Sequence, residues 1–156
     1  MITGDFHKEN ENAETISIPH TYNAVDGQNG TSMWRGKGFY TNEFTLTESD
    51  LEQDIYLEVG AASMISIVSI NNQKIHTNTC PYSLYRVALN DFVSSGINRI
   101  TIVTDNSTNR CCLPANGRFF FLWWTLPKMF ELFVHPNYTL TTWMEVVTVS
   151  ESIRKN

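Results

Sequence analysis

Short strand-like segments separated by turn residues recur about every ten residues through the middle of this sequence, and that spacing limits the folds available to it. The segments are rich in β-branched and aromatic residues, which suit a pleated sheet. They occupy residues 38–46, 54–59, 64–70, 74–78, 83–89 and 99–104. We therefore expect an all-β fold, an antiparallel sandwich, in preference to a helical or α/β fold.

Alternation within the segment 38–46 indicates which of its faces lies inside. Tyr40, Asn42, Phe44 and Leu46 fall on one face and are predicted to face the core. Between two later segments, residues 71–74 read Asn-Asn-Gln-Lys. Asn tolerates the left-handed backbone of tight hairpins, so a turn is predicted there.

Length and charge exclude several classes of protein. The 156 residues allow one domain with a sizeable core. With 16 acidic and 11 basic residues, the net charge of −5 argues against nucleic acid or an anionic membrane as the partner. A neutral sugar is compatible with that charge but is not required by it.

The N-terminus and the cysteines suggest a cytoplasmic location. The first 14 residues are polar and lack the apolar segment of a signal peptide. Cys80, Cys111 and Cys112 give neither a disulfide framework nor metal-ligand spacing, and are expected to be free thiols. The apolar run 119–134 is too short to span a bilayer and is interrupted by charge. No cofactor is predicted.

Residues 16–46 carry a specific order of motifs. A strand leads into Pro-His-Thr-Tyr-Asn at 19–23, a Gly- and Asp-rich loop follows at 26–30, and Arg-Gly-Lys-Gly-Phe-Tyr at 35–40 opens the next strand. This order resembles the N-terminal domain of glycoside hydrolase family 2, the β-galactosidase and β-glucuronidase group. The resemblance continues in order to residue 107, although Asn72 and Cys80-Pro81 replace usual glycines.

The resemblance implies a jelly-roll β-sandwich, of the galactose-binding-domain type, that binds sugar. On this basis residues 1–15 are a polar leader and residues 16–110 the sugar-binding domain. In the family the catalytic carboxylates lie in a later barrel domain. Retaining hydrolysis needs two carboxyl groups about 5–5.5 Å apart, and the Asn-Glu pairs at 10–11 and 42–43 lack that context. No catalytic residue is assigned.

Beyond residue 109 the resemblance stops, and CCLPANGRFFFLWWTLPK replaces the family's expected motif. A one-base shift of reading frame from Cys112 permits VYPQMADFSFYGGLYR, and a two-base shift from His135 permits PKLHFDYLDGGGDGVRVN. Both resemble the family's next segments. We therefore expect residues 111–156 to be an out-of-frame tail and the sandwich to be incomplete at its C-terminus. A divergent but genuine C-terminus is the alternative.

An incomplete sandwich would leave strand backbone unpaired along an edge. The tail also carries an apolar cluster with no assigned place in the core, and poor solubility is predicted for the chain as translated. Its members are Phe119, Phe120, Phe121, Trp123, Trp124, Phe130 and Phe133.

Three residues are candidates for sugar contacts through the resemblance. Arg35 offers paired donors, Trp34 a ring face for a pyranose, and Asp26 an acceptor for hydroxyl groups. For each, the alternative is a structural role in a turn, in packing or in an ion pair. Arg118 occupies the place of a family Asp that reaches the sugar site. The four histidines lack the spacing of a metal site.

The sequence thus indicates a carbohydrate-binding fragment of a β-galactosidase-like enzyme, without the catalytic barrel. Its expected partners are a β-galactoside or related sugar and the remaining domains of the parent enzyme. A free-standing carbohydrate-binding module and a purely structural assembly domain remain as alternatives. Whether the chain acts as an enzyme, and on which glycoside, stays open.

Overall fold

The computed structural model describes residues 14–16, 36–62, 65–81 and 83–107, together with the backbone of strands at 130–134, 139–142 and 147–151. These residues form strands and one short helix. In chain order the elements are β1 (Glu14–Ile16), β2 (Lys37–Leu46), α1 (Glu48–Leu51), β3 (Ile55–Val59), β4 (Ile65–Ile70), β5 (Gln73–Asn78), β6 (Tyr85–Ala88), β7 (Gly96–Asp105), β8 (Phe130–Val134), β9 (Thr139–Thr142) and β10 (Val147–Glu151).

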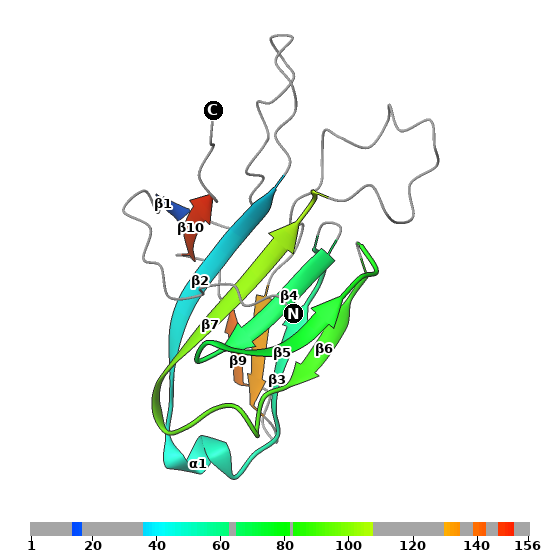
Figure 1. The fold of residues 1–156 in the computed structure, drawn as a ribbon. Coiled ribbons are helices and arrows are strands. Elements are labelled where there is room, and N and C mark those ends of the chain that lie inside the picture. Colours follow the sequence, from blue (N-terminus) through cyan, green and yellow to red (C-terminus); the bar gives the residue numbers. More distant parts are fainter. Residues whose placement is uncertain are drawn as a thin grey trace, which may run out of the picture.

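Two antiparallel sheets face each other (Figure 1). The larger has six strands in the order β1-β10-β2-β7-β4-β5, and the smaller has four in the order β6-β3-β8-β9. At the centre of the larger sheet, β2 pairs with β7 over ten residues, from Lys37 opposite Asp105 to Leu46 opposite Gly96. The predicted antiparallel sandwich of an all-β protein is confirmed.

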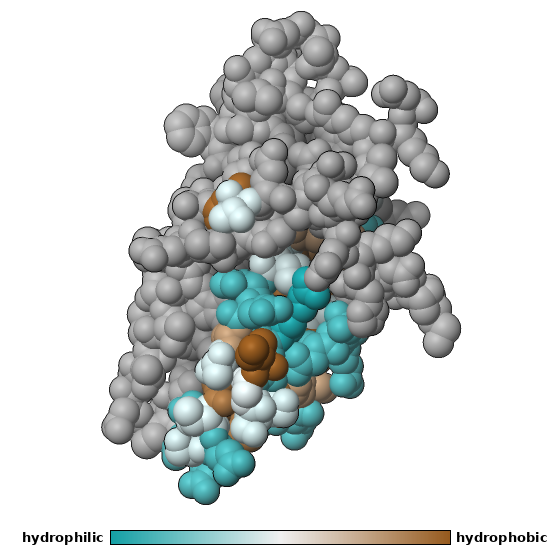
Figure 2. Space-filling model, turned by 90° about the vertical axis from the view of Figure 1, so that its left-hand side faces the viewer, coloured by the Kyte–Doolittle hydropathy of each residue, from teal (hydrophilic) through white to brown (hydrophobic). Residues whose placement is uncertain are grey.

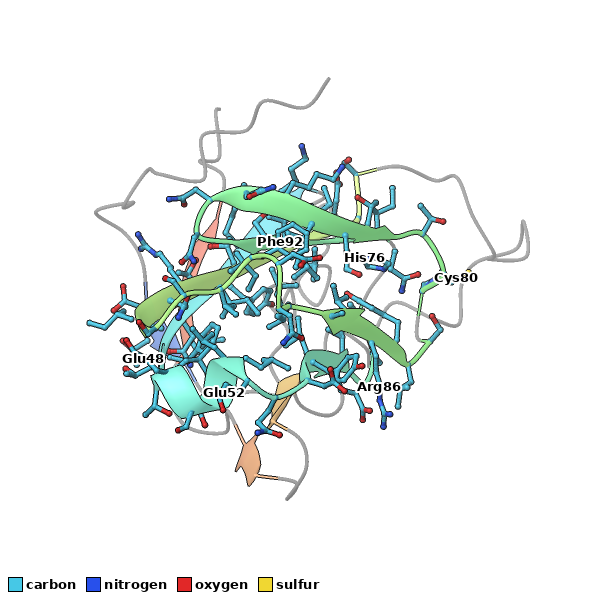
Figure 3. All side chains as sticks on the ribbon, turned by 90° about the horizontal axis from the view of Figure 1, so that it is seen from below. Glu48, Glu52, His76, Cys80, Arg86 and Phe92 are labelled. Carbon is cyan, nitrogen blue, oxygen red and sulfur yellow. The ribbon has the colours of Figure 1, made fainter. Side chains whose placement is uncertain are left out.

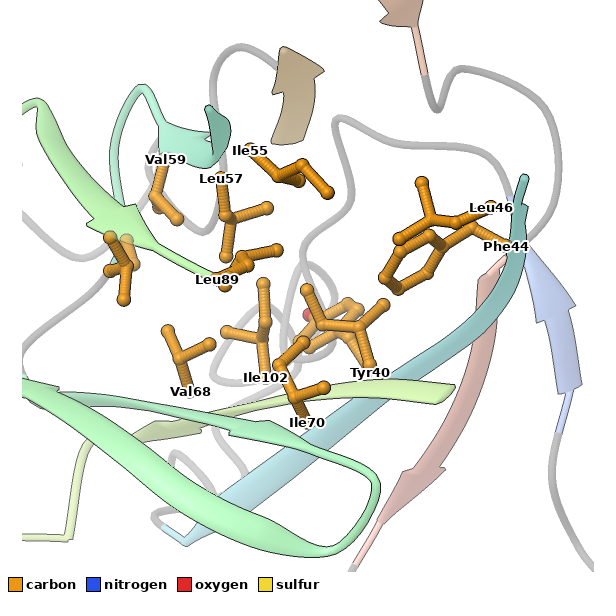
Figure 4. Packing of buried hydrophobic residues seen from close by; sticks show 13 residues of the cluster. Tyr40, Phe44, Leu46, Ile55, Leu57, Val59, Val68, Ile70, Leu89 and Ile102 are labelled. Carbon is orange, nitrogen blue, oxygen red and sulfur yellow. The ribbon is translucent and has the colours of Figure 1, made fainter. Parts of the chain in front are cut away.

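The core lies between the sheets, as alternation predicts. Tyr40, Phe44 and Leu46 of β2 are buried, and so are Ile55, Leu57 and Val59 of β3. Figure 4 shows side chains from both sheets converging on one apolar layer. Asn42 shares the inner face of β2 but is only half-buried. On the side seen in Figure 2, the described surface is mainly hydrophilic with isolated hydrophobic residues.

The β4–β5 hairpin turns at the predicted place. Asn71 and Asn72 have φ of 48° and 69°, a left-handed pair that matches the twist of two-residue hairpins. A bulge follows, because the register shifts between Val68 and Ser69 and places Ile75 as an extra residue on β5. Ile75 packs against the core cluster.

Several boundaries differ from the sequence prediction. The segment predicted at 83–89 is a ladder strand only over β6. Leu89 has left the ladder, yet it is fully buried and its N–H donates to the carbonyl of Ile55 at 2.9 Å. Strand β7 begins at Gly96, where φ of +95° suits glycine.

The helix α1 was not predicted from the sequence. Its N-cap is Thr47, whose Oγ1 accepts from the N–H of Asp50 at 3.3 Å. The Asp50 carboxylate accepts in return from the N–H of Thr47 at 2.8 Å. This reciprocal capping box starts a helix of only four residues. The hydrogen bonds from the Thr47 side chain and backbone lower the pKa of Asp50.

The tail contributes strands to both sheets, which the sequence prediction did not anticipate. Strand β8 pairs with β3 from Ile55 opposite Val134 to Val59 opposite Phe130. Strand β10 pairs with β2 from Thr41 to Gly38. The expectation of an unpaired edge is therefore wrong for β2 and β3, since the residues after 111 supply strand partners for both.

The described helix α1 is far too short to cross a bilayer, and the described residues include no other helix that is long and apolar enough to do so.

Candidate ligand-binding end of the sandwich

One end of the sandwich brings together the start of β2, the end of β7 and the start of β4. Lys37 and Ile65 both lie opposite Asp105 there. Strand β5 ends at the same level, since Asn78 lies opposite Ser66. We call this the Gly36 end, after the residue that precedes β2. In Figure 1 it is the upper end, opposite α1.

Gly36 and Asn106 close the end of the β2–β7 pair. The Gly36 N–H donates to Oδ1 of Asn106 at 2.7 Å, and the Asn106 N–H donates to the carbonyl of Gly36 at 3.1 Å. Ser107 is tied in turn to Asp105, whose Oδ1 accepts from the Ser107 N–H at 2.8 Å. These bonds fix where the chain enters β2 and leaves β7.

At this end, the inner face of the larger sheet changes from apolar to polar or small residues. Gly38, Thr104, Ser66 and Asn78 lie opposite one another across β2, β7, β4 and β5. We call these four residues the polar row. Two residues further into the sandwich, the corresponding positions are Tyr40, Ile102, Val68 and His76. Tyr40, Ile102 and Val68 belong to the core cluster, so alternation places the polar row on the same inner face.

Tyr85 joins the two sheets at this level. It opens β6 in the smaller sheet, and its hydroxyl group hydrogen-bonds to Oγ of Ser66 at 2.8 Å. Its ring stacks on His76 of β5, with centroids 5.1 Å apart and an interplanar angle of 29°. Burial raises the pKa of Tyr85, and the hydrogen bond to Ser66 offsets part of that rise. Figure 3 shows His76 on the side of the sandwich that carries Cys80 and Arg86, away from Glu48 and Glu52.

Asn78 anchors the loop from β5 to β6. Its Oδ1 accepts from the N–H of Cys80 at 3.0 Å, and its Nδ2 donates to the carbonyl of Cys80 at 2.9 Å. The Ser83 hydroxyl donates to the same carbonyl at 2.9 Å. The loop is thereby held beside the polar row, and Cys80 is exposed as a free thiol.

Four buried side-chain atoms among the described residues have no hydrogen-bond partner: Ser69 Oγ, Asn72 Oδ1, Arg99 Nε and Thr104 Oγ1. Only Thr104 belongs to the polar row. Its side chain is 0% exposed, and its neighbour Ser66 is 1% exposed. A buried hydroxyl group without a partner costs free energy, so among the described residues Thr104 Oγ1 is an unfavourable position within the polar row.

The sequence candidates Asp26, Trp34 and Arg35 lie outside the described residues. Trp34 and Arg35 directly precede Gly36 in the sequence, which the structure places at the Gly36 end. Of the Asn-Glu pairs, the one at 42–43 lies in β2 with Glu43 exposed, as expected of strand surface. Within the described residues no group of three or more His, Cys, Asp or Glu is placed to hold a metal ion.

Sequence reasoning missed the polar row and Tyr85. A signal was present, because Gly38, Ser66 and Thr104 are small or polar residues at the ends of otherwise apolar strand faces. Their juxtaposition depends on the register of four strands, which the sequence pattern does not give.

Comparison with known proteins identifies relatives of one kind. No model of a protein family matches the sequence. Two proteins of Formosa agariphila that carry the name β-glucuronidase are 29% identical over 112 residues and 28% identical over 103 residues. The matches cover 71% and 60% of this chain but only 14% and 10% of those relatives. The chain therefore spans a small part of the length of the proteins it resembles.

Solved structures that are similar to this chain carry the same kinds of names. An FMN-binding β-glucuronidase of F. prausnitzii is 32% identical with a TM-score of 0.57, covering 65% of this chain and 16% of that one. A β-glucuronidase from glycoside hydrolase family 2 is 25% identical with a TM-score of 0.58, covering 69% of this chain and 12% of that one. A Bacteroides fragilis structure that carries the name β-galactosidase shares the fold, with a TM-score of 0.59 over 86% of this chain and 18% of its own. These relatives support a family like glycoside hydrolase family 2.

Proposed function

We propose that this chain is the carbohydrate-binding front domain of a family 2-like β-glycosidase, carried on a fragment that lacks the catalytic barrel. The observation that carries the proposal is the combination of a β-sandwich with relatives named β-glucuronidase of which it spans only 10% to 14%. A single sandwich of this size matches one domain of a much longer enzyme. The parent enzyme would hydrolyse a β-glycosidic bond by double displacement, with both carboxyl groups on its barrel.

The Gly36 end is the proposed place of sugar contact. Trp34 and Arg35 directly precede Gly36 in the sequence, and Asp26 belongs to the Gly- and Asp-rich segment before them. An aromatic ring face, a guanidinium group and a carboxylate are the groups that commonly hold a pyranose and its hydroxyl groups. The hydrogen-bonded closure between Gly36 and Asn106 fixes the chain at Gly36, the residue that follows Arg35 in the sequence. The proposed ligand is a β-galactoside or a related sugar.

Sugar binding by the full chain tests this proposal. Saturation-transfer difference NMR with methyl β-D-galactopyranoside should give ligand signals that saturate with concentration, since that measurement needs little soluble protein. Trp34→Ala and Arg35→Ala should weaken those signals, and Glu43→Ala, an exposed change on β2, serves as the control. No saturable signal with any glycoside would refute a sugar-binding role.

A purely structural role in assembly predicts a different result from a sugar-binding role. Adding the chain to a parent enzyme that lacks this region would then restore glycosidase activity, although the isolated chain binds no sugar. A restored activity together with saturable binding supports the sugar-binding domain instead.

We also propose that residues 111–156 arise from out-of-frame translation. The support is the order in which the shifted readings reproduce two successive family segments. Resequencing the gene across the codons for Arg110 and Lys128 tests it. Corrections of single bases that open a long frame would support the proposal, and an unchanged sequence with no barrel-coding frame beyond it would refute it.

A further inference from the structure

We propose that Asn106 is a positioning residue, because its side-chain amide sets the peptide group that joins Arg35 to Gly36. Asn106 directly follows β7, and its Oδ1 accepts from the Gly36 N–H at 2.7 Å across 70 residues of sequence. It thereby acts on the segment to which the proposed function assigns sugar contacts, so this role rests on that function.

The side chain of Asn106 takes the place of a regular ladder bond. Opposite residues of an antiparallel pair commonly exchange two backbone hydrogen bonds. Gly36 and Asn106 would be the next such pair after Lys37 and Asp105. The Asn106 N–H does donate to the Gly36 carbonyl, at 3.1 Å, but the Gly36 N–H donates to the Asn106 side chain. The entry into β2 therefore depends on the residue type at position 106.

The Gly36 N–H belongs to the planar peptide group that links Arg35 to Gly36. Because the group is planar, an acceptor that holds this N–H also holds the orientation of the whole group, up to the α-carbon of Arg35. Glycine has more backbone freedom than any other residue, so a bond from outside is needed to keep this link in one conformation. Asn106 supplies that bond next to the Arg35 side chain.

Asn106 is itself held in place on the sheet. The residue before it, Asp105, lies opposite Lys37 in the β2–β7 pair. The residue after it, Ser107, donates its N–H to Oδ1 of Asp105 at 2.8 Å. The bond from Gly36 to Asn106 is also partly buried, and a hydrogen bond away from water is electrostatically stronger than one in water. The amide is thus presented from a fixed point at the end of β7.

Trypsin tests the positioning directly, because it cleaves on the carboxyl side of arginine and so cuts the Arg35–Gly36 bond itself. Cleavage of a folded chain reports how often the local structure opens. In the full chain, Asn106→Ala should raise the rate of cleavage at this bond, followed by mass spectrometry, by about twofold to tenfold, the value of one neutral hydrogen bond. The variant keeps the backbone bond from position 106, so it isolates the side chain.

Two further variants separate positioning from a general loss of stability. Asn106→Asp keeps a side-chain oxygen as the acceptor and should return the cleavage rate to that of the original chain. Asn90→Ala is the matched control, because Asn90 Oδ1 also accepts from an N–H at the start of a strand, that of Ile55 in β3 at 3.0 Å. It should leave cleavage after Arg35 unchanged at a temperature where all the variants are folded. An equal increase in Asn90→Ala, or an Asp variant cleaved as fast as the Ala variant, would overturn the proposal.

Sugar binding tests the consequence of the positioning. In saturation-transfer difference NMR, Asn106→Ala should bind methyl β-D-galactopyranoside about twofold to tenfold more weakly than the original chain, and Asn106→Asp should restore binding. If the original chain binds the galactoside and Asn106→Ala binds it equally well, the positioning role fails and the proposed function stands. If the original chain binds no glycoside, the proposed function fails, and cleavage after Arg35 still decides whether Asn106 fixes that peptide group.

Discussion

Asn98 is fully buried and holds three segments of chain together through its amide group. Its Oδ1 accepts from the N–H of Ser94 at 3.0 Å and from Nδ2 of Asn71 at 2.9 Å. Its Nδ2 donates to the carbonyls of Ser94 at 2.6 Å and Gly96 at 3.2 Å. An Asn in an alternating strand reads as an ordinary polar residue, so its burial and its partners were not predicted from the sequence.

Loss of this amide should be costly. We expect Asn98→Ala to lower the free energy of unfolding by about 3 kcal/mol, because it removes four hydrogen bonds of a fully buried amide group at about 0.5–1.5 kcal/mol each. The control is Asn42→Ala, where the half-buried side chain has one hydrogen bond to a described residue, from the N–H of its neighbour Glu43. That change should cost less than about 1 kcal/mol. Urea denaturation measures both, and equal losses would contradict the assignment.

The stability of the folded chain should depend on pH through Tyr85. Burial raises its pKa above the ordinary 10.0, so the folded chain holds the phenolic proton more tightly than the unfolded chain. The resulting stability is fully present below pH 10 and is lost as pH rises through the folded pKa. We expect the melting temperature to fall as pH rises above 10, and Tyr85→Phe to reduce that fall.

Ser66→Ala is the control for the alkaline effect. It removes the same hydrogen bond but keeps the buried phenol, so its melting temperature should still fall with pH. Because the bond to Ser66 lowers the pKa of Tyr85, its loss should not weaken the pH dependence. A Ser66→Ala chain that behaves like Tyr85→Phe would show that ionisation of Tyr85 is not the cause.

At the scale of elements, the β4–β5 hairpin combines a predictable turn with an unpredicted network. Asn71 and Asn72 both adopt the left-handed backbone that their sequence indicates. Their side chains differ, because Asn71 donates to the carbonyl of Phe92 and to Asn98 and accepts from the N–H of Arg99. Asn72 has a buried Oδ1 with no partner.

Glycine substitutions should separate backbone from side chain in this hairpin. Glycine adopts both φ values without strain, so only side-chain bonds differ between the two sites. We expect Asn71→Gly to lower the free energy of unfolding by about 1–3 kcal/mol through the bonds it loses. Asn72→Gly should leave stability unchanged or raise it, because it removes an unpaired acceptor. Urea denaturation measures both variants. If they lose the same free energy of unfolding, the side-chain bonds of Asn71 do not contribute to stability.

For the whole molecule, the tail is the part on which sequence and structure differ most. Its strands β8 and β10 pair with β3 and β2, so the sandwich does not end on those strands. Any extended segment can form backbone hydrogen bonds to a strand, because every residue except proline carries the same backbone donor and acceptor. Pairing alone therefore does not show that the tail is the domain's native continuation.

Solubility tests the origin of the tail. We expect the chain as translated to elute from size-exclusion chromatography mainly as aggregate, because residues 119–124 bring Phe-Phe-Phe-Leu-Trp-Trp into one short segment. A variant carrying VYPQMADFSFYGGLYR and PKLHFDYLDGGGDGVRVN in its place should elute as a single species and melt cooperatively. A translated chain that is itself monodisperse and cooperative would contradict the out-of-frame hypothesis.

The sequence by itself determined the fold class, most strands, the inner face of β2 and the β4–β5 turn. These follow from local rules, namely a period of two and the backbone preference of Asn. Only the tertiary structure placed Gly38, Thr104, Ser66 and Asn78 in one line and brought Tyr85 to them. That arrangement depends on the register of strands up to 66 residues apart in sequence, such as Gly38 and Thr104. Register is fixed by packing between the sheets, which no single segment encodes.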